Sequence, residues 1–240
     1  LRKGGVSDVA SAKEIGRAYT HGANAYEESE TAKAEIDELN TKIYEIVDAQ
    51  EDVASLSEGD RALLYLWQKG REVSMEEFNR LFSILGTRHD YTFFDSDTTR
   101  PGVAAVRDGL AKGIFEESEG AIVYKGEKKG LFTLVFITSR GNPTYETKDI
   151  GLAFLKEERA ETDQVIIITA VEQISHFKVV LAALEDIAPN LAAKTSHLAH
   201  GLLQLTTGKM SSRKGNVIPA AELIGSLVEA ASERNPDPLV

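Results

Sequence analysis

The chain has 240 residues, of which 42% are hydrophobic, and a formal net charge of −11 at pH 7. This hydrophobic content suffices for a globular core, whereas the acidic balance argues against a surface that coats nucleic acid. The sequence has no cysteine, no apolar run long enough to cross a membrane and no signal-peptide pattern at its start, so disulfides and thiolate metal sites are excluded and we expect a cytoplasmic protein without a membrane anchor.

The first third of the chain is expected to be helical. Apolar residues recur at helical spacing over residues 32–47, within an acidic stretch that we interpret as a solvated outer face. Ser74 and Glu77 form a capping-box pattern, which predicts that a further helix begins there. No residue pattern typical of catalysis occurs in residues 1–86, so we expect a helical insertion or layer.

From about Thr87 the pattern changes to alternating helices and short apolar runs. The run 165–169 is apolar up to Thr169, which is typical of a strand buried on both faces. Such alternation predicts a parallel α/β sheet that binds ligands at the carboxyl ends of its strands. The expected elements are a β-prone run at 90–95, a helix opened by Pro101 and ending at Lys112, strands at 120–124 and 131–138, helices at 148–159 and 175–187, a last strand at 202–205 and a helix at 220–232.

A basic run, GKMSSRKGN at 208–216, follows the expected last strand. Lys209, Arg213 and Lys214 place three cations within six residues, and glycines on both sides give the backbone freedom. Such cations suit the stabilisation of charge that builds on a triphosphate during displacement. The run fits neither a P-loop nor a dinucleotide fingerprint, and a solvated basic turn is the alternative interpretation.

The basic run resembles the Lys-Met-Ser-Lys-Ser signature of class I aminoacyl-tRNA synthetases, in the Lys-Met-Ser-Ser-Arg form of arginyl-tRNA synthetases. Ser212 stands where the general pattern has its second lysine, and Lys214 or a residue outside this chain would substitute for it. The resemblance covers nearly the whole chain and is strongest over residues 120–218. It implies catalytic roles for Lys209, Ser211, Ser212, Arg213 and Lys214, and ATP binding by Gly201, Lys209 and Met210.

Tyr145, Thr147 and Asp149 form Y-x-T-x-D at a strand-to-helix junction. This run is similar to the arginyl family's L-Y-x-T-x-D, with Thr144 in place of the leucine, and the resemblance implies that Tyr145 and Asp149 line the amino-acid pocket. A guanidinium needs a carboxylate for bidentate pairing and an aromatic or hydroxyl neighbour. Helix capping by Thr147 or Asp149 is the alternative interpretation.

Two further runs resemble family motifs near the expected strand ends. Asp95-Ser96 is similar to the family's Glu-Ser, which contributes a carboxylate to the arginine pocket; because Asp is one methylene shorter, its direct contact with arginine stays open. The run from Glu172 to Phe177 is similar to E-Q-x-x-H-F, in which Gln173 is the candidate for a polar contact to arginine or adenosine. We expect His176 to pack beside Phe177.

His197 and His200 are interpreted as packing residues, and no metal site is expected. The resemblance implies the following organisation: a helical insertion at 1–86, the second half of a Rossmann-like catalytic domain at 87–218 with the signature loop at 209–213, and a helix at 219–240 leading toward an anticodon-binding domain. The family's His-Ile-Gly-His half does not occur in the chain, so we expect residues 1–240 alone to be inactive.

The implied reaction is ATP-dependent activation of L-arginine to arginyl-adenylate, followed by transfer of arginine to tRNA(Arg). Mg²⁺ would accompany the ATP phosphates, no tightly bound cofactor is expected, and the parent protein is expected to be a monomer. One alternative is a non-catalytic nucleotide- or tRNA-binding relic of the same fold. Another is a class I synthetase for a different amino acid, against which the carboxylates of Asp95 and Asp149 favour a cationic substrate.

Overall fold

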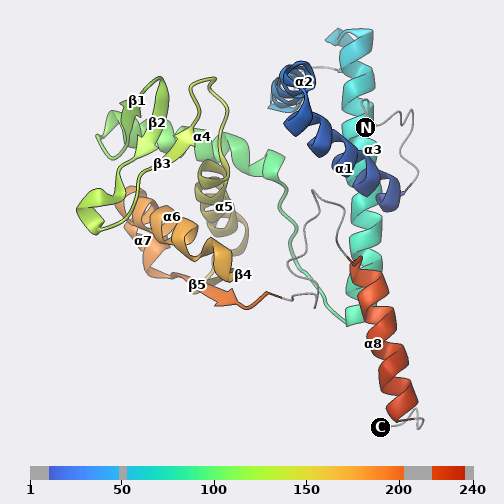
Figure 1. The fold of residues 1–240 in the computed structure, drawn as a ribbon. Helices are drawn as coiled ribbons and strands as arrows, with labels where there is room; N and C mark the ends of the chain where they lie inside the picture. The colour runs from blue at the N-terminus through green and yellow to red at the C-terminus, as the bar shows by residue number, and fades with distance from the viewer. Residues whose placement is uncertain (1–10, 49–52, 203–217, 236–240) are drawn as a thin grey trace. The chain divides into compact units, whose positions relative to one another are not determined.

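The computed structural model describes residues 11–48, 53–202 and 218–235, which belong to two compact units (Figure 1). The first unit, which we call the helical unit, comprises Leu1–Asp90 together with Gln204–Val240. The second unit comprises Tyr91–Leu203. In the described part of the chain, no helix is both long and apolar enough to cross a membrane. The basic run at 208–216 lies outside the described residues.

The first unit is built from helices, as the apolar spacing predicts. Ser11 and Ser57 begin two of them by accepting hydrogen bonds from the backbone N–H groups of Glu14 and Asp60. Gly86, at φ 65°, ends the longest helix in the left-handed conformation that favours glycine. The elements are α1 (Ala12–Glu28), α2 (Glu30–Asp48), η2 (Val53–Ser55), α3 (Glu58–Leu85) and α8 (Ala220–Arg234).

The helix start predicted at Ser74 is wrong, because α3 runs through this residue without a break. The Ser74 hydroxyl donates to the carbonyl oxygen of Gly70 at 2.8 Å, one turn earlier, so it is satisfied inside the helix and does not cap one. Helices α1, α2 and α3 pack against one another and line an apolar groove of about 560 Å³. The predicted closing helix at 220–232 is confirmed by α8.

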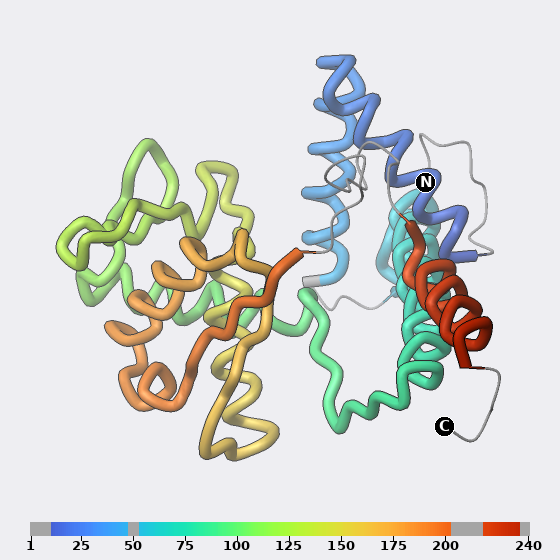
Figure 2. Tube along the Cα trace, turned by 60° about the horizontal axis from the view of Figure 1, so that its bottom comes forward, coloured from blue at the N-terminus to red at the C-terminus, as the bar shows by residue number. Residues whose placement is uncertain are grey.

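The second unit contains two small sheets. An antiparallel sheet has the strand order β1-β2-β3, and β4 pairs in parallel with β5, from Val165 opposite Thr195 to Ala170 opposite His200. Figure 2 follows the crossover from β4 through α6 and α7 to β5. The predicted α/β class with a parallel pairing is therefore confirmed. The elements are α4 (Asp95–Ala111), β1 (Glu116–Ser118), β2 (Ala121–Tyr124), η3 (Gly126–Lys129), β3 (Leu134–Ile137), α5 (Tyr145–Ala160), β4 (Val165–Ala170), η4 (Val171–Gln173), α6 (Ile174–Ile187), α7 (Pro189–Ala193) and β5 (Thr195–His200).

The β-prone run predicted at 90–95 is not a strand, and α4 begins at Asp95, before Pro101. The carboxylate of Asp97 accepts the backbone N–H of Phe94 at 3.0 Å, and the hydroxyl of Thr98 donates to the carbonyl oxygen of Asp95 at 2.8 Å. These local bonds favour a helix start over the strand preference of the aromatic residues, and they move the start ahead of the proline.

Strand β4 occupies its predicted place, but the prediction that both its faces are buried is wrong. Ile166 and Ile168 are 53% and 63% exposed, whereas Ile167 packs against the core. The described residues therefore cover one face of this strand pair. The last strand predicted at 202–205 is also displaced: β5 ends at His200, Leu202 lies beyond it, and 203–205 are outside the described residues. The sequence of β5 is largely polar and contains two histidines, so a search for apolar runs does not detect this strand.

Helices α4 and α5 cross at unusually short range. A Cβ atom at Gly151 would lie 2.0 Å from the carbonyl oxygen of Thr98, and one at Gly102 would lie 2.1 Å from that of Thr147. Only glycine permits this approach, which brings the start of α4 close to the first turns of α5. The adjoining core consists of Val106, Phe115, Tyr124, Phe136, Ile137, Ile150, Phe177, Val179, Val180, Ala183 and Leu184.

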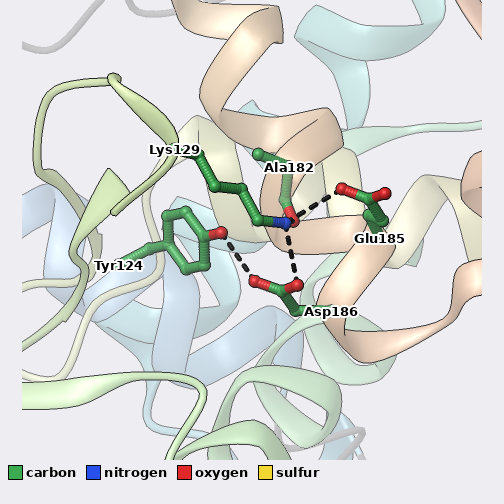
Figure 3. A network of polar contacts seen from close by, with 5 residues as sticks. All are labelled: Tyr124, Lys129, Ala182, Glu185 and Asp186. Carbon is green, nitrogen blue, oxygen red and sulfur yellow. Dashed lines mark hydrogen bonds and ion pairs between the residues drawn. The ribbon is translucent and has the colours of Figure 1, made fainter. Parts of the chain in front are cut away.

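A polar network ties the antiparallel sheet to helix α6 (Figure 3). The Tyr124 hydroxyl donates to Asp186 Oδ2 at 2.7 Å, and Lys129 Nζ donates to Asp186 Oδ1 at 2.8 Å, to Glu185 at 2.9 Å and to the Ala182 carbonyl at 3.1 Å. Burial of the ring, together with the hydrogen bond to Asp186, raises the pKa of Tyr124 to about 12. The hydroxyl thus stays protonated, and the network fixes α6 against the sheet.

Candidate active site

The first turn of α5 is anchored to the end of strand β3. The backbone N–H and the hydroxyl of Thr144 both donate to the carbonyl oxygen of Phe136 at 2.9 Å, and the fully buried hydroxyl of Thr147 donates to the same oxygen. Thr147 is therefore used to join helix and strand, and the Asp149 carboxylate bonds to His176. The capping alternative is wrong for both side chains. The anchor fixes the positions from which Tyr145 and Asp149 project.

Three charged side chains from α5 and α6 form a cluster beside this anchor, which we call the Glu146–His176–Asp149 cluster. His176 Nε2 lies 2.7 Å from Asp149 Oδ2, and its Nδ1 lies 3.4 Å from Glu146 Oε1. The side chains are only 16% (Glu146), 18% (His176) and 26% (Asp149) exposed. The bonds to Asp149 and then Glu146 raise the pKa of His176 to about 9. The ring is thus an imidazolium near neutral pH.

Glu146 is ionised in the same cluster. Burial works to raise the pKa of its carboxyl group, but hydrogen bonds from His176 and Thr144 hold that pKa below its usual value. Two carboxylates and one imidazolium give the cluster a net charge of −1. Such a cluster attracts a cationic group, while its one cation, His176, offsets the repulsion between the two carboxylates.

Lys148 links two other predicted residues, Asp95 and Tyr145. Its Nζ lies 3.1 Å from Asp95 Oδ2 and 5.3 Å from the centre of the Tyr145 ring. The Lys148 side chain is 10% exposed, whereas the Asp95 side chain is 66% exposed. The Tyr145 residue is exposed as well. A cationic ligand that paired with Asp95 would therefore share that carboxylate with Lys148.

Gln173 and Gly201 follow the carboxyl ends of the parallel strands. Gln173 is the exposed last residue of η4, directly after β4, and Gly201 is exposed directly after β5. A Cβ atom at Gly201 would meet no atom within 4 Å, so its backbone is open to a close approach by a flat ligand. Both residues lie at the sheet edge where parallel α/β proteins bind ligands.

The remaining histidines of this region make ordinary contacts. The His197 ring stacks on Phe177 at 4.6 Å between centres, and its Nε2 lies 2.7 Å from the Thr169 hydroxyl. His200 Nδ1 donates to the carbonyl oxygen of Gly201 at 2.7 Å. In the described ranges, no group of three or more His, Asp or Glu side chains is arranged to hold a metal ion.

Among the described residues, the cavity that Asp149 borders is too small to hold arginine or ATP. Asp149 borders a cavity of about 50 Å³, whose lining is mainly apolar. Sites for small molecules typically have volumes of about 300–1,000 Å³. The predicted residues that lie outside the described part of the chain are Lys209, Met210, Ser211, Ser212, Arg213 and Lys214.

Sequence reasoning missed the charged partners of the predicted carboxylates. The spacing of Glu146 and Asp149, three residues apart on one helix, places both on the same face and is a usable signal. The pairing of His176 with Asp149 has no local signal, because it joins two helices across 27 positions of the sequence. His176 does contact the Phe177 ring edge-on at 4.9 Å, as expected, in addition to its two carboxylate partners.

Comparison with known proteins places the chain in a family. Residues 11–237 match the family described as tRNA synthetases class I (R), catalytic domain. The arginine–tRNA ligase of Borreliella burgdorferi is 30% identical over 224 residues, covering 90% of this chain and 36% of the relative. The Bdellovibrio bacteriovorus arginine–tRNA ligase is 32% identical over 192 residues, covering 79% and 33%. The chain spans about a third of the length of these curated relatives.

Solved structures agree on the fold. The crystal structure of arginyl-tRNA synthetase from Plasmodium falciparum superposes with a TM-score of 0.58 at 15% identity, covering 95% of this chain and 44% of that chain. The structure of a putative arginyl-tRNA synthetase from Campylobacter jejuni gives a TM-score of 0.50 at 17% identity, with coverages of 78% and 43%. The family match over residues 11–237 shows that the chain belongs to the arginine class of class I tRNA synthetases, within their catalytic domain.

Proposed function

We propose that the protein is an arginine–tRNA ligase, which activates L-arginine with ATP and transfers it to tRNA(Arg). The observation that carries this proposal is the half-buried carboxylate of Asp149 at the start of α5, in a cluster with a net charge of −1, within a chain of this family. A partly buried carboxylate of this kind suits a charge-assisted hydrogen bond with a guanidinium. Tyr145 would contribute an aromatic face, and Gln173 a polar contact.

In the proposed reaction, the arginine carboxylate attacks the α-phosphorus of ATP, the bond to the β-phosphate oxygen breaks, and pyrophosphate leaves. The tRNA 3′ hydroxyl then attacks the carbonyl carbon of the adenylate and releases AMP. The described residues would bind and orient arginine, with Gly201 beside the adenine. The basic run 209–214 would stabilise the phosphate charge, and Mg²⁺ would accompany the phosphates as part of the substrate.

The substitution Asp149→Ala in a full-length enzyme containing this chain tests the proposal. It should raise the KM for arginine strongly and leave the KM for ATP nearly unchanged, because loss of one member of a buried charge pair costs about 2–5 kcal/mol. ATP–pyrophosphate exchange measures both constants. The matched control is Asp163→Ala, which removes an exposed carboxylate from the second unit. Unchanged arginine kinetics in Asp149→Ala would refute the assignment of Asp149 to the arginine site.

The role of the basic run is tested by Lys209→Ala and Lys214→Ala in the same enzyme. If Lys209 acts mainly in the transition state, its loss should lower the rate of adenylate formation by about 10²–10³ with little change in ATP affinity. A loss of similar size in Lys214→Ala would mean that this lysine replaces the one missing at Ser212. Rapid-quench measurement of adenylate formation distinguishes these outcomes. A wild-type rate in Lys209→Ala would favour the alternative interpretation, in which the basic run is a solvated turn without a catalytic role.

We also expect residues 1–240 alone to form no detectable adenylate, since the sequence contains no His-Ile-Gly-His run. ATP–pyrophosphate exchange with arginine and tRNA(Arg) present is the measurement. Robust exchange by the isolated chain would contradict this expectation and would show that its residues complete the adenosine site themselves.

A further inference from the structure

His176 has both ring nitrogens directed at carboxylate oxygens, Nε2 at Asp149 and Nδ1 at Glu146. The Nε2 contact, at 2.7 Å, is a hydrogen bond, and the Nδ1 contact, at 3.4 Å, is at ion-pair distance. Because ionised carboxylates accept hydrogen bonds and do not donate them, this arrangement favours a ring that carries hydrogen on both nitrogens. A helix-face histidine that merely packs against Phe177 requires neither partner. The His176 ring packs against the Phe177 ring, and both of its nitrogens contact carboxylates of the first turns of α5.

We propose that His176 is a positioning residue for the arginine site, where its imidazolium holds the Asp149 carboxylate through Oδ2 and leaves Oδ1 to the guanidinium. The proposal rests on the proposed function of Asp149. Among the described residues, the Asp149 carboxylate forms no other hydrogen bond. A guanidinium that approaches Oδ1 therefore meets an oxygen whose orientation is already fixed, which lowers the cost of ordering the pair on binding.

The imidazolium also sets the charge of the site. Without it, Glu146 and Asp149 would be two like charges on adjacent turns of α5, and their repulsion would favour protonation of one of them. The charged groups that face His176 are these two carboxylates from α5, while His197 from β5 touches Phe177 and Thr169 instead. Lys156 acts on Asp149 at longer range, and burial lowers the pKa of this lysine.

The first test uses the 240-residue chain and does not depend on activity. Long-range ¹H–¹⁵N spectra of the histidine rings, with the His176 signal assigned by its loss in His176→Gln, should show both nitrogens protonated at pH 7 and a titration midpoint well above 8. Asp149→Asn and Glu146→Gln should each lower that midpoint, and Asp149→Asn should lower it more. A neutral ring at pH 7, or a midpoint that Asp149→Asn does not move, would overturn the proposal.

The second test uses the full-length enzyme. His176→Gln should raise the arginine KM about tenfold at pH 7.5, as expected for one weakened charge-assisted hydrogen bond, with the ATP KM unchanged. In the wild type the arginine KM should rise as the pH increases beyond 9, because the imidazolium loses its proton. The His176→Gln variant should lack this pH-dependent rise. The matched control His197→Gln removes a ring that touches neither carboxylate and should retain the wild-type pH dependence.

The two proposals fail separately. Unchanged arginine kinetics in Asp149→Ala would remove the proposed function, whatever the histidine spectra show. A raised arginine KM in Asp149→Ala, combined with wild-type arginine kinetics in His176→Gln at all pH values, would leave the function standing and refute the positioning role. A parallel rise of the KM for arginine and for ATP in His176→Gln would also refute it, because that pattern indicates a general structural loss.

Discussion

The two units of the chain differ in how deeply they bury their apolar side chains. In Tyr91–Leu203, large residues such as Phe136, Ile150 and Val179 are completely inaccessible to solvent. Among the described residues of the helical unit, the most deeply buried hydrophobic residue is Ala18, at 4% exposed, and α8 has no buried residue. Dense packing restricts side chains to single arrangements, so groups that must be placed accurately belong in the densely packed unit.

The distribution of the site residues follows this difference. The Glu146–His176–Asp149 cluster and the Asp95–Lys148 pair both lie in the unit with the dense core, on helices held by buried threonine and glycine contacts. The helical unit instead derives its elements from capping and apolar periodicity. Local sequence signals build helices in both units, whereas the accurate placement of charge depends on packing.

The largest expected loss of stability is in the core of the second unit. Phe136→Ala should lower the free energy of unfolding of its unit by about 3–5 kcal/mol, because it leaves a cavity between Phe115 and Tyr124. Leu39→Ala, in the partly exposed groove of the helical unit, should cost only about 1 kcal/mol. Native-state hydrogen exchange on the 240-residue chain reports each unit separately, and equal losses of stability would contradict a difference in packing density between the units.

Glycine substitutions should have opposite signs in the two units. Gly151→Ala should destabilise by about 3 kcal/mol, since its Cβ would lie 2.0 Å from the Thr98 carbonyl oxygen and backbone must move. Gly70→Ala in α3 should stabilise by about 0.5–1 kcal/mol, because its Cβ would meet no atom within 4 Å and alanine favours helix. Urea unfolding of both variants measures this, and a stabilising Gly151→Ala would show that the crossing of α4 and α5 is looser than described.

The smallest expected loss of stability in the second unit comes from its pH dependence. Because the folded-state pKa of His176 is raised to about 9, its contribution to stability is fully present below the unfolded value near 6.5 and is lost as pH rises through 9. We expect a loss of about 2 kcal/mol between pH 7 and pH 10. Hydrogen exchange at several pH values should show this loss in wild type and not in His176→Gln. An identical pH dependence in the two proteins would contradict it.

The outcome of individual predictions shows which signals were local. The strand at 165–169, the helix at 175–187 and the helix at 220–232 follow from apolar runs and periodicity, and the structure confirms all three. The strand expected at 90–95 failed because hydrogen bonds around Asp97 outweighed aromatic propensity. Strand β5 was missed because its exposed and partly buried positions both include polar residues, so that no apolar alternation marks it and its pairing with β4 decides its conformation.

For this protein, the sequence by itself determined the α/β class, the helical character of its first third, and the motif residues Tyr145 and Asp149, because helix and strand periods and motif spacings are local properties of a chain. Only the tertiary structure decided that His176 bridges Glu146 and Asp149. It also decided that Lys148 forms an ion pair with Asp95, and that Gly102 and Gly151 allow α4 to pack closely against α5. These contacts join residues up to 53 positions apart, and their energies depend on burial and on distance, which a one-dimensional pattern does not contain.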